Sequence, residues 1–260
     1  MTTTTTRFER LSIHGEAPAV FITLNHPPLN IIDLAMMEEL TSVLNQVESQ
    51  SSISIIGFKG AAECFSAGVD VAAHTRETVS SMLGKFHAVV RALVSTRKVT
   101  IAAVDGHCLG GGAELAMVCD LVYTTEDATW GFPEIQLGCF PPVAATALAA
   151  LIGQKRAADL ILSGRNISGA EAARMGLASA AVPQAELSSV VAQCAARIGT
   201  LSPAALAVTK KALYAWDSMH FDKGLARAEK IYREELVETI DAQEGIRAFL
   251  EKRAPKWTGR

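Results

Sequence analysis

Apolar runs alternate with amphipathic stretches along the first half of the chain. Residues 19–24, 53–59 and 99–104 form mostly apolar runs that are typical of buried strands. Residues 34–47 and 81–94 carry apolar side chains at helical spacing, and Asp33 is suited to cap the first of these helices. This alternation of strands and helices predicts an α/β fold.

From about residue 144 onward the strand signals fade and helical patterns continue. We expect helices at 144–151, 154–162, 169–175, 186–198, 203–215 and 221–250, the last broken near 238–241. The apolar faces of this region exceed what a small subdomain can cover, so we expect contacts between subunits to hide them. We therefore divide the chain into a disordered tail at 1–7, a core at 8–200 and a helical region at 201–260.

The run from Asp105 to Asp120 places three successive glycines directly before a helical pattern that carries Glu114. Glycine lets the backbone approach a ligand closely, and the free N–H groups at a helix start favour an oxygen with negative charge. Such a geometry can form an oxyanion hole. The run matches neither common nucleotide-binding loop. A tight junction between strand and helix would explain the glycines alone equally well.

Two further segments add to this picture. Residues 130–138 place Glu134 in a turn-rich, mostly apolar setting, where desolvation would raise the pKa of its carboxyl group. Taken alone, Glu134 would more often be a solvated loop acid. Residues 64–70 follow the predicted strand at 53–59 and form a turn that contains Gly68, which can offer a second backbone donor.

Together these segments resemble the enoyl-CoA hydratase/isomerase (crotonase) family. The shared motifs are F-S-A-G-x-D at 65–70, A-V-x-G-x-x-L-G-G-G-x-E-L-A-x-x-C-D at 103–120 and G-x-P-E-I at 131–135, and the resemblance runs from about residue 8 to residue 256. It implies a spiral of ββα units with a carboxyl-terminal helical region that forms a homo-trimer, often paired into a hexamer. It also implies an acyl-CoA thioester as substrate, with no separate cofactor and no metal.

The resemblance assigns roles to four residues. The backbone N–H groups of Val69 and Gly111 would hold the thioester oxygen, while Glu114 and Glu134 would act on one water molecule. The presence of both acids favours hydration of an α,β-unsaturated thioester, with Glu114 as the base and Glu134 as the acid that protonates the α-carbon. The two acids could share these roles, because coupled carboxyl groups titrate as a pair. Isomerisation or other enolate chemistry, and CoA binding without catalysis, remain alternatives.

The resemblance also implies a coenzyme A site. It would include Ala67 and Asp70 in the first motif, and Phe249 and Lys252 contributed by the last helix of a neighbouring subunit. Considered without the family, Lys252 is a solvated basic residue near a helix end, where it suits the helix dipole.

Departures from the family pattern concern the acyl group. Phe132, Phe140, Pro141 and Val143 stand where straight-chain hydratases carry polar or glycine-rich segments, which predicts a rigid apolar pocket for a bulky or cyclic acyl group. This combination resembles the cyclohexa-1,5-diene-1-carbonyl-CoA hydratases of aromatic degradation. His74, which lies downstream of the first motif, could equally be an exposed histidine at a helix start.

Charge and cysteine content exclude several other classes. The 260 residues carry a formal net charge of −3, with no basic cluster that would suit nucleic acid or an anionic membrane. No apolar run approaches the ~18 residues of a membrane span, and the first residues lack a signal-peptide core. The five cysteines form no C-x-x-C pair, so we expect buried free thiols and a cytoplasmic enzyme.

Overall fold

The computed structural model of the chain describes residues 8–259, with the side chains of residues 215–220 left out. The tail predicted at residues 1–7 lies outside the described residues.

Two sheets organise the fold. The larger sheet is parallel apart from its first two strands, which pair antiparallel, and has the order β1 (Leu11–Glu16), β2 (Ala19–Leu24), β3 (Ile55–Gly60), β4 (Val99–Val104), β6 (Leu121–Thr125) and β9 (Ala180–Val182). The smaller sheet has the order β5 (His107–Leu109), β7 (Thr129–Gly131) and β8 (Asn166–Ser168).

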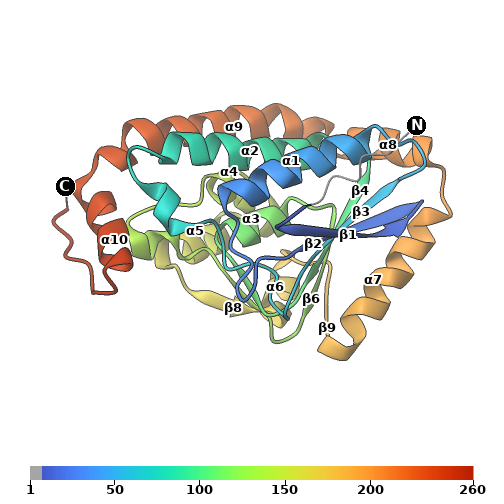
Figure 1. The fold of residues 1–260 in the computed structure, drawn as a ribbon, viewed down its shortest axis with the longest axis horizontal. Helices are drawn as coiled ribbons and strands as arrows, with labels where there is room; N and C mark the ends of the chain where they lie inside the picture. The colour runs from blue at the N-terminus through green and yellow to red at the C-terminus, as the bar shows by residue number, and fades with distance from the viewer. Residues whose placement is uncertain (1–7, 260) are drawn as a thin grey trace.

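Helices cover both faces of the larger sheet. Helices α1 (Leu34–Glu48) and α2 (Val79–Ser95) lie side by side above it in Figure 1, and α7 (Gln184–Gly199) packs against β3, β4 and β6. The strands supply apolar side chains to both layers, since Ile56 and Phe58 belong to the main core while Ile55 packs with Leu187 of α7. This two-sided burial explains why the strands read as continuous apolar runs.

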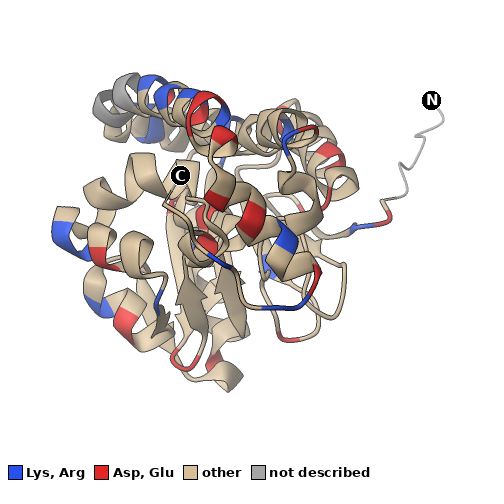
Figure 2. Cartoon of the chain, turned by 90° about the vertical axis from the view of Figure 1, so that its left-hand side faces the viewer, with Lys and Arg blue, Asp and Glu red and all other residues tan. Residues whose placement is uncertain are grey.

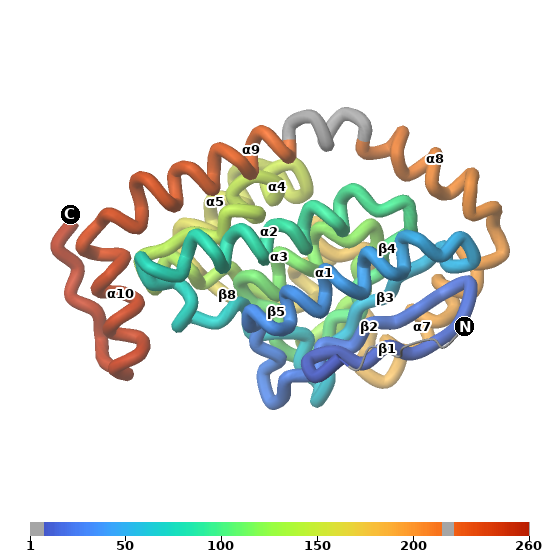
Figure 3. The backbone as a smooth tube through the Cα atoms, turned by 45° about the horizontal axis from the view of Figure 1, so that its top comes forward, coloured from blue at the N-terminus to red at the C-terminus, as the bar shows by residue number. Residues whose placement is uncertain are grey.

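Helix α9 (Ala215–Glu234) runs along the top of the molecule in Figure 1, and α10 (Ile240–Leu250) lies at its left-hand end. In Figure 3, α9 runs beside α2 and α4 (Pro142–Ile152), and α10 folds back past the end of α9. Helix α10 thereby contacts two short 3₁₀ turns of its own chain, η1 (Val71–His74) and η2 (Pro133–Leu137). The other elements are α3 (Gly111–Met117), α5 (Gln154–Ser163), α6 (Gly169–Met175), α8 (Pro203–Leu213) and η3 (Leu236–Glu238).

The structure confirms the α/β class and most predicted elements. Strands β2 and β4 have the predicted bounds, Asp33 Oδ1 accepts the cap hydrogen bond from Met36 N, and η3 interrupts the last long helical stretch at the predicted place. The prediction missed β1 and the short strands β5 to β9. It was also incomplete after residue 144, where β8 and β9 lie between helices.

Charge and helix length bear on possible partners. Lysine and arginine residues are interspersed with aspartate and glutamate on the helices that face the viewer in Figure 2. Among the described residues, no single helix is both long and apolar enough to cross a membrane. Only α7 and α8 taken together reach that length and composition, and they are bent by 106°.

Candidate active site

Strand β5 brings the segment that ends at Val69 next to the start of α3. Leu109 N donates to Ser66 O at 3.0 Å, and Ser66 N donates to His107 O at 2.9 Å. On its other side the same segment is fixed by Ile32 N, which donates to Gly68 O at 2.9 Å. These pairings bring Val69 and Gly111 beside each other, although they are 42 positions apart in the sequence.

The backbone N–H groups of Val69 and Gly111 are free in this arrangement. Within residues 8–259, neither of them donates a hydrogen bond to a protein acceptor. A Cβ atom on Gly111 would lie 3.4 Å from Val69 N and 2.6 Å from Val69 Cγ2. A side chain at position 111 would therefore collide with Val69, and both residues line the same cavity. Two free donors at a cavity wall can stabilise an oxyanion.

Glu114 is buried on α3 and points at the first turn of α4. Its Oε1 accepts hydrogen bonds from Val143 N at 2.8 Å and Ala144 N at 2.9 Å. Burial raises the pKa of the Glu114 carboxyl group to about 7, although these two hydrogen bonds act in the opposite direction. The helix start thus favours the ionised form of Glu114 near neutral pH.

Glu134 lies on η2, against the turn that opens α3. A Cβ atom on Gly110, whose φ is +51°, would lie 2.7 Å from Glu134 Oε1. The other oxygen, Oε2, is buried without a hydrogen-bond partner among the described residues. Burial, together with the charge of nearby Glu114, raises the pKa of Glu134 to about 8. At neutral pH the site can therefore hold one carboxylate and one carboxylic acid.

Both acids and both free donors line one cavity of about 320 Å³, which we call the acid cavity. Phe140 and Pro141 contribute to its apolar wall, and the Phe140 ring contacts that of Tyr232 at a centroid distance of 5.1 Å. Other apolar side chains complete this wall, among them Val71, Met82, Leu83, Phe86, Leu137 and Pro142.

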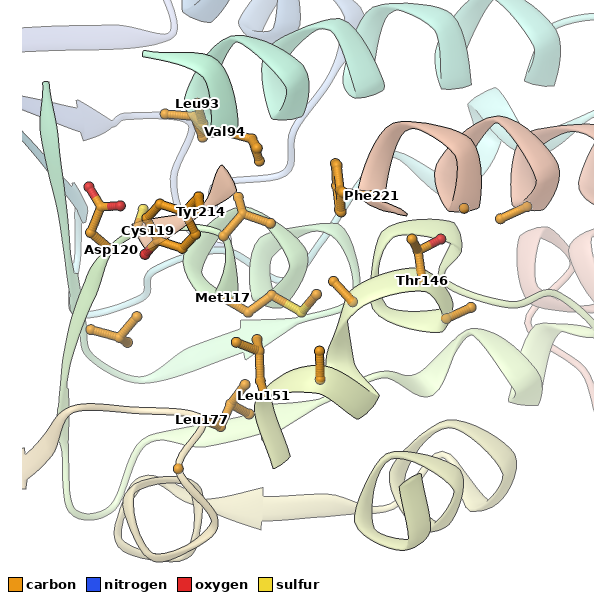
Figure 4. A pocket seen from close by; sticks show the side chains of 18 of the residues that line it. Leu93, Val94, Met117, Cys119, Asp120, Thr146, Leu151, Leu177, Tyr214 and Phe221 are labelled. Carbon is orange, nitrogen blue, oxygen red and sulfur yellow. The ribbon is translucent and has the colours of Figure 1, made fainter. Parts of the chain in front are cut away.

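Phe140 also lines a second cavity of about 590 Å³, which we call the apolar cavity. Figure 4 shows Met117, Leu151, Leu177 and Phe221 around this space.

The predicted acyl-pocket residues divide into two groups. Phe140 and Pro141 line the acid cavity, whereas Phe132 and Val143 do not. Both of the latter are fully buried in the main core, and Val143 reaches the site only through its N–H group. The prediction treated neighbours in sequence as neighbours in the wall. Phe132, just after β7, and Val143, in the first turn of α4, instead pack their side chains into the core.

The predicted coenzyme A residues are also placed differently from one another. Ala67 and Phe249 both line the acid cavity. Phe249 does so from α10 of the same chain, whereas the sequence suggested a neighbouring subunit. Asp70 Oδ1 accepts from Ala72 N at 3.0 Å and so caps η1. Lys252 is exposed just beyond α10 and does not line the cavity.

Two histidines also line the acid cavity. His74 Nδ1 lies 3.0 Å from Asp70 O. His87, which the sequence analysis did not select, is fully buried on α2, with Nδ1 2.7 Å from Glu229 Oε1. Its other ring nitrogen, Nε2, has no hydrogen-bond partner among the described residues. The available signal was a histidine within the apolar face of the predicted helix at 81–94.

Comparison with known proteins places this geometry in a family. Residues 15–260 match the family model described as enoyl-CoA hydratase/isomerase. The chain belongs to this family. The prediction of an enzyme of the enoyl-CoA hydratase type is thereby confirmed, as is the predicted fold class.

Several members of the enoyl-CoA hydratase/isomerase family are similar to this chain over nearly its full length. A probable enoyl-CoA hydratase from Mycobacterium bovis is 35% identical and covers 97% of this chain and 99% of the relative. A cyclohexa-1,5-dienecarbonyl-CoA hydratase from Thauera aromatica is 33% identical, with 92% of each chain covered. The crystal structure of an enoyl-CoA hydratase from Mycobacterium avium subsp. paratuberculosis K-10 superposes with a TM-score of 0.87 at 25% identity, over 97% of this chain and 100% of that chain.

Proposed function

We propose that the protein hydrates an α,β-unsaturated acyl-CoA thioester with a cyclic acyl group, such as cyclohexa-1,5-diene-1-carbonyl-CoA. The observation that carries this proposal is the pairing of two buried acids, with pKa values of about 7 and about 8, in one cavity with two free backbone donors. The similarity to relatives named as hydratases supports the reaction, and one of these is named for the cyclic substrate.

In the proposed reaction the thioester oxygen accepts hydrogen bonds from Val69 N and Gly111 N. Negative charge grows on this oxygen as water adds to the double bond, and two preorganised donors stabilise it. Judging from other oxyanion holes, each donor contributes roughly 3–4 kcal/mol to the transition state. Because the two N–H groups donate to no acceptor among the described residues, no hydrogen bond seen there is lost when the substrate arrives.

The two acids complete the addition of water. Glu114, ionised at the start of α4, removes a proton from water as the oxygen bonds to the β-carbon. Glu134, protonated because of burial and the neighbouring charge, gives its proton to the α-carbon. One proton leaves water and one reaches carbon, so the pair ends with the charges exchanged and returns to its starting state by proton transfer between the acids.

The lining of the acid cavity supports a ring-sized acyl group. Phe140 lines both this cavity and the larger apolar cavity, and the Tyr232 ring packs against the Phe140 ring. Pro141 and Pro142 restrict the backbone of the same wall. For coenzyme A we propose that Ala67 and Phe249 contact the adenine end, with Asp70 and Lys252 at the mouth of the site.

The test is a comparison of thioesters with the purified protein. We expect kcat/KM for cyclohexa-1,5-diene-1-carbonyl-CoA to exceed that for crotonyl-CoA by at least ~10², because each missing methylene-sized contact costs about 1–3 kcal/mol. Phe140→Ala should shrink this ratio, since it removes the wall between the two cavities. Preference of the wild-type enzyme for crotonyl-CoA would overturn the cyclic substrate but leave hydration in place. No hydration of either thioester would overturn both.

We also propose a cytoplasmic homo-trimer or hexamer. All five cysteines are buried free thiols, as expected in a reducing compartment. Val208 and Leu213 of α8 are 68% and 70% exposed, which leaves an apolar face for another subunit to cover. Light scattering should give the mass of a trimer or twice that mass, and a stable monomer would contradict the assembly.

A further inference from the structure

His87 is a buried titratable group at the acid cavity that the hydration chemistry does not use. It lines the cavity, is fully buried and is tied through Nδ1 to Glu229. Its Nε2 is buried without a partner among the described residues, in a protein where most buried polar groups are satisfied. An unpaired buried polar atom lowers stability, so such an atom on a residue that lines a cavity indicates a ligand that completes it.

The surroundings of His87 determine which nitrogen carries the proton. Glu229 Oε1 also accepts from Arg91 Nη2 at 2.8 Å, and Arg233 lies 4.0 Å from Glu229 Oε2. Burial alone would raise the pKa of Glu229, but the hydrogen bonds from His87 and Arg91 lower it. Burial lowers the pKa of His87, and this outweighs the attraction of Glu229. His87 is thus neutral, with its proton on Nδ1 facing the carboxylate and a lone pair on Nε2.

We place His87 at the acyl end of the acid cavity from its neighbours in the structure. The preceding residue, Phe86, lies against Gly111, since a Cβ atom there would be 3.3 Å from Phe86 Cζ. Glu229 comes from α9, the helix that also supplies Tyr232 beside Phe140. Phe86, His87 and Tyr232 thus line the same cavity as the two backbone donors. Ala67 and Phe249, which we assign to coenzyme A, come from other elements.

We propose that His87 Nε2 accepts a hydrogen bond from a hydroxyl group on the acyl moiety, so that the preferred substrate is a hydroxylated, ring-sized enoyl-CoA. This inference rests on the proposed function, because it assumes an acyl-CoA in the acid cavity. A neutral acceptor requires a donor, which excludes a carboxylate or carbonyl substituent. A hydroxyl group also fits the apolar wall around His87, where a cationic donor would lose its hydration.

The first test uses the wild-type enzyme and matched substrates. Cyclohex-1-ene-1-carbonyl-CoA is compared with the same thioester carrying a hydroxyl group at each ring carbon remote from the thioester, and with a ring carrying a carboxylate. We expect at least one hydroxylated isomer to show kcat/KM about tenfold or more above the parent ring, because a buried acceptor left unpaired discriminates against the parent. The gain should appear mainly in KM, since the hydroxyl group is remote from the reacting carbons.

The second test removes the acceptor. His87→Phe keeps a buried ring but has no Nε2, and should bring the ratio of hydroxylated to parent substrate down to about one or below. Glu229→Gln, which weakens the orientation of the imidazole, should lower the ratio part of the way. His14→Phe, at an exposed position on β1, is the matched control and should keep the wild-type ratio. Because each ratio is measured within one enzyme, a change in the folded fraction cancels.

The outcomes separate the proposals. A wild-type enzyme that hydrates the parent ring but prefers no hydroxylated isomer, or that prefers the carboxylate, would overturn the role of His87 and leave the proposed function intact. A ratio of hydroxylated to parent substrate that stays at the wild-type value in His87→Phe would also overturn the role of His87. Failure to hydrate any thioester would count against the proposed function.

Discussion

The acid cavity and the apolar cavity share Phe140 but differ in how their polar groups are paired. The apolar cavity is the larger, at about 590 Å³ against about 320 Å³. Its charged residues include Asp120 and Lys210, and Asp120 Oδ2 accepts from Lys210 Nζ at 2.8 Å and from Thr100 N at 2.7 Å. In the acid cavity, Val69 N, Gly111 N, Glu134 Oε2 and His87 Nε2 lack partners within the described part of the chain.

This contrast shows that unsatisfied polar atoms indicate chemistry better than volume does. In the apolar cavity, Asp120 and Lys210 already have partners, so their ion pair contributes to the stability of the fold. The free groups of the acid cavity reduce stability and are retained where a ligand can complete them. Four predictions test this difference, in order of their expected effect on activity.

The largest effect should come from the two acids. Glu114→Gln and Glu134→Gln should each lower kcat by at least ~10², because each removes one proton transfer, while the affinity for the CoA ester stays nearly unchanged. Glu16→Gln, at an exposed position on β1, is the matched control and should keep wild-type turnover. Steady-state kinetics with an enoyl-CoA thioester measures this. Near wild-type turnover in either acid variant would refute the assignment.

A smaller effect should follow from the turn that opens α3. Gly110→Ala places a Cβ atom 2.7 Å from Glu134 Oε1 on a backbone with φ +51°, so it displaces the acid as well as straining the chain. We expect kcat to fall about tenfold or more and stability to fall by about 1–2 kcal/mol.

Gly153→Ala is a control that separates backbone strain from the displacement of Glu134. Gly153 also has a positive φ, of +86°, but a Cβ atom there would meet no other atom within 4 Å. This control should lose stability by strain and keep its turnover. Equal loss of turnover in both variants would mean that the effect on Gly110→Ala does not act through Glu134.

The next prediction concerns pH. The proposed reaction needs Glu114 ionised and Glu134 protonated, so kcat/KM should rise as pH increases toward about 7 and fall above about 8. Both folded-state pKa values lie above the ordinary value of 4.5. The folded state therefore binds more protons than the unfolded state between pH 4.5 and 8, and stability should fall as pH rises through this window.

The stability change gives the pH prediction a second measurement. Glu134→Gln removes a charge that is buried above pH 8, so its melting temperature should exceed that of the wild type at pH 9 and approach it at pH 5. Thermal unfolding at the two pH values checks this. An acid variant that is less stable than the wild type at pH 9 would show that the carboxylate has partners in the folded state.

Much of this site could be predicted from the sequence, and the reasons for the misses are physical. Glu114, Glu134, Val69 and Gly111 lie in local motifs, and the structure brings all four to one cavity. A local motif does not determine whether a side chain lines the cavity or packs in the core. Phe132 shows this, because it lies in the G-x-P-E-I motif but is buried in the core. The role of the α4 start in holding Glu114, through Val143 N and Ala144 N, required a contact about 30 residues away in sequence.

The fold shows the same division between local and distant information. Long strands such as β2 and β4 are buried on both faces and carry an apolar signal of their own. Strands β5, β7, β8 and β9 have three residues each and exist through their pairing with one another or with β6. The His87 to Glu229 contact likewise joins α2 to α9 across 142 positions. Neither feature has a signature in a short sequence window.

The smallest effect on activity should come from the apolar cavity. Lys210→Met removes the partner of Asp120 while keeping most of the side-chain volume, and leaves a carboxylate that is 12% exposed without its cation. Breaking a buried ion pair in this way costs about 3–5 kcal/mol, so chemical denaturation should show a large loss of stability. Lys211→Met, at the exposed neighbouring position on α8, should change stability by less than about 0.5 kcal/mol.

The turnover of the folded Lys210→Met enzyme should stay within about twofold of wild type, because Lys210 contacts none of the free groups of the acid cavity. A tenfold loss of kcat in this variant would show that the two cavities are coupled across Phe140, and the distinction between them would fail.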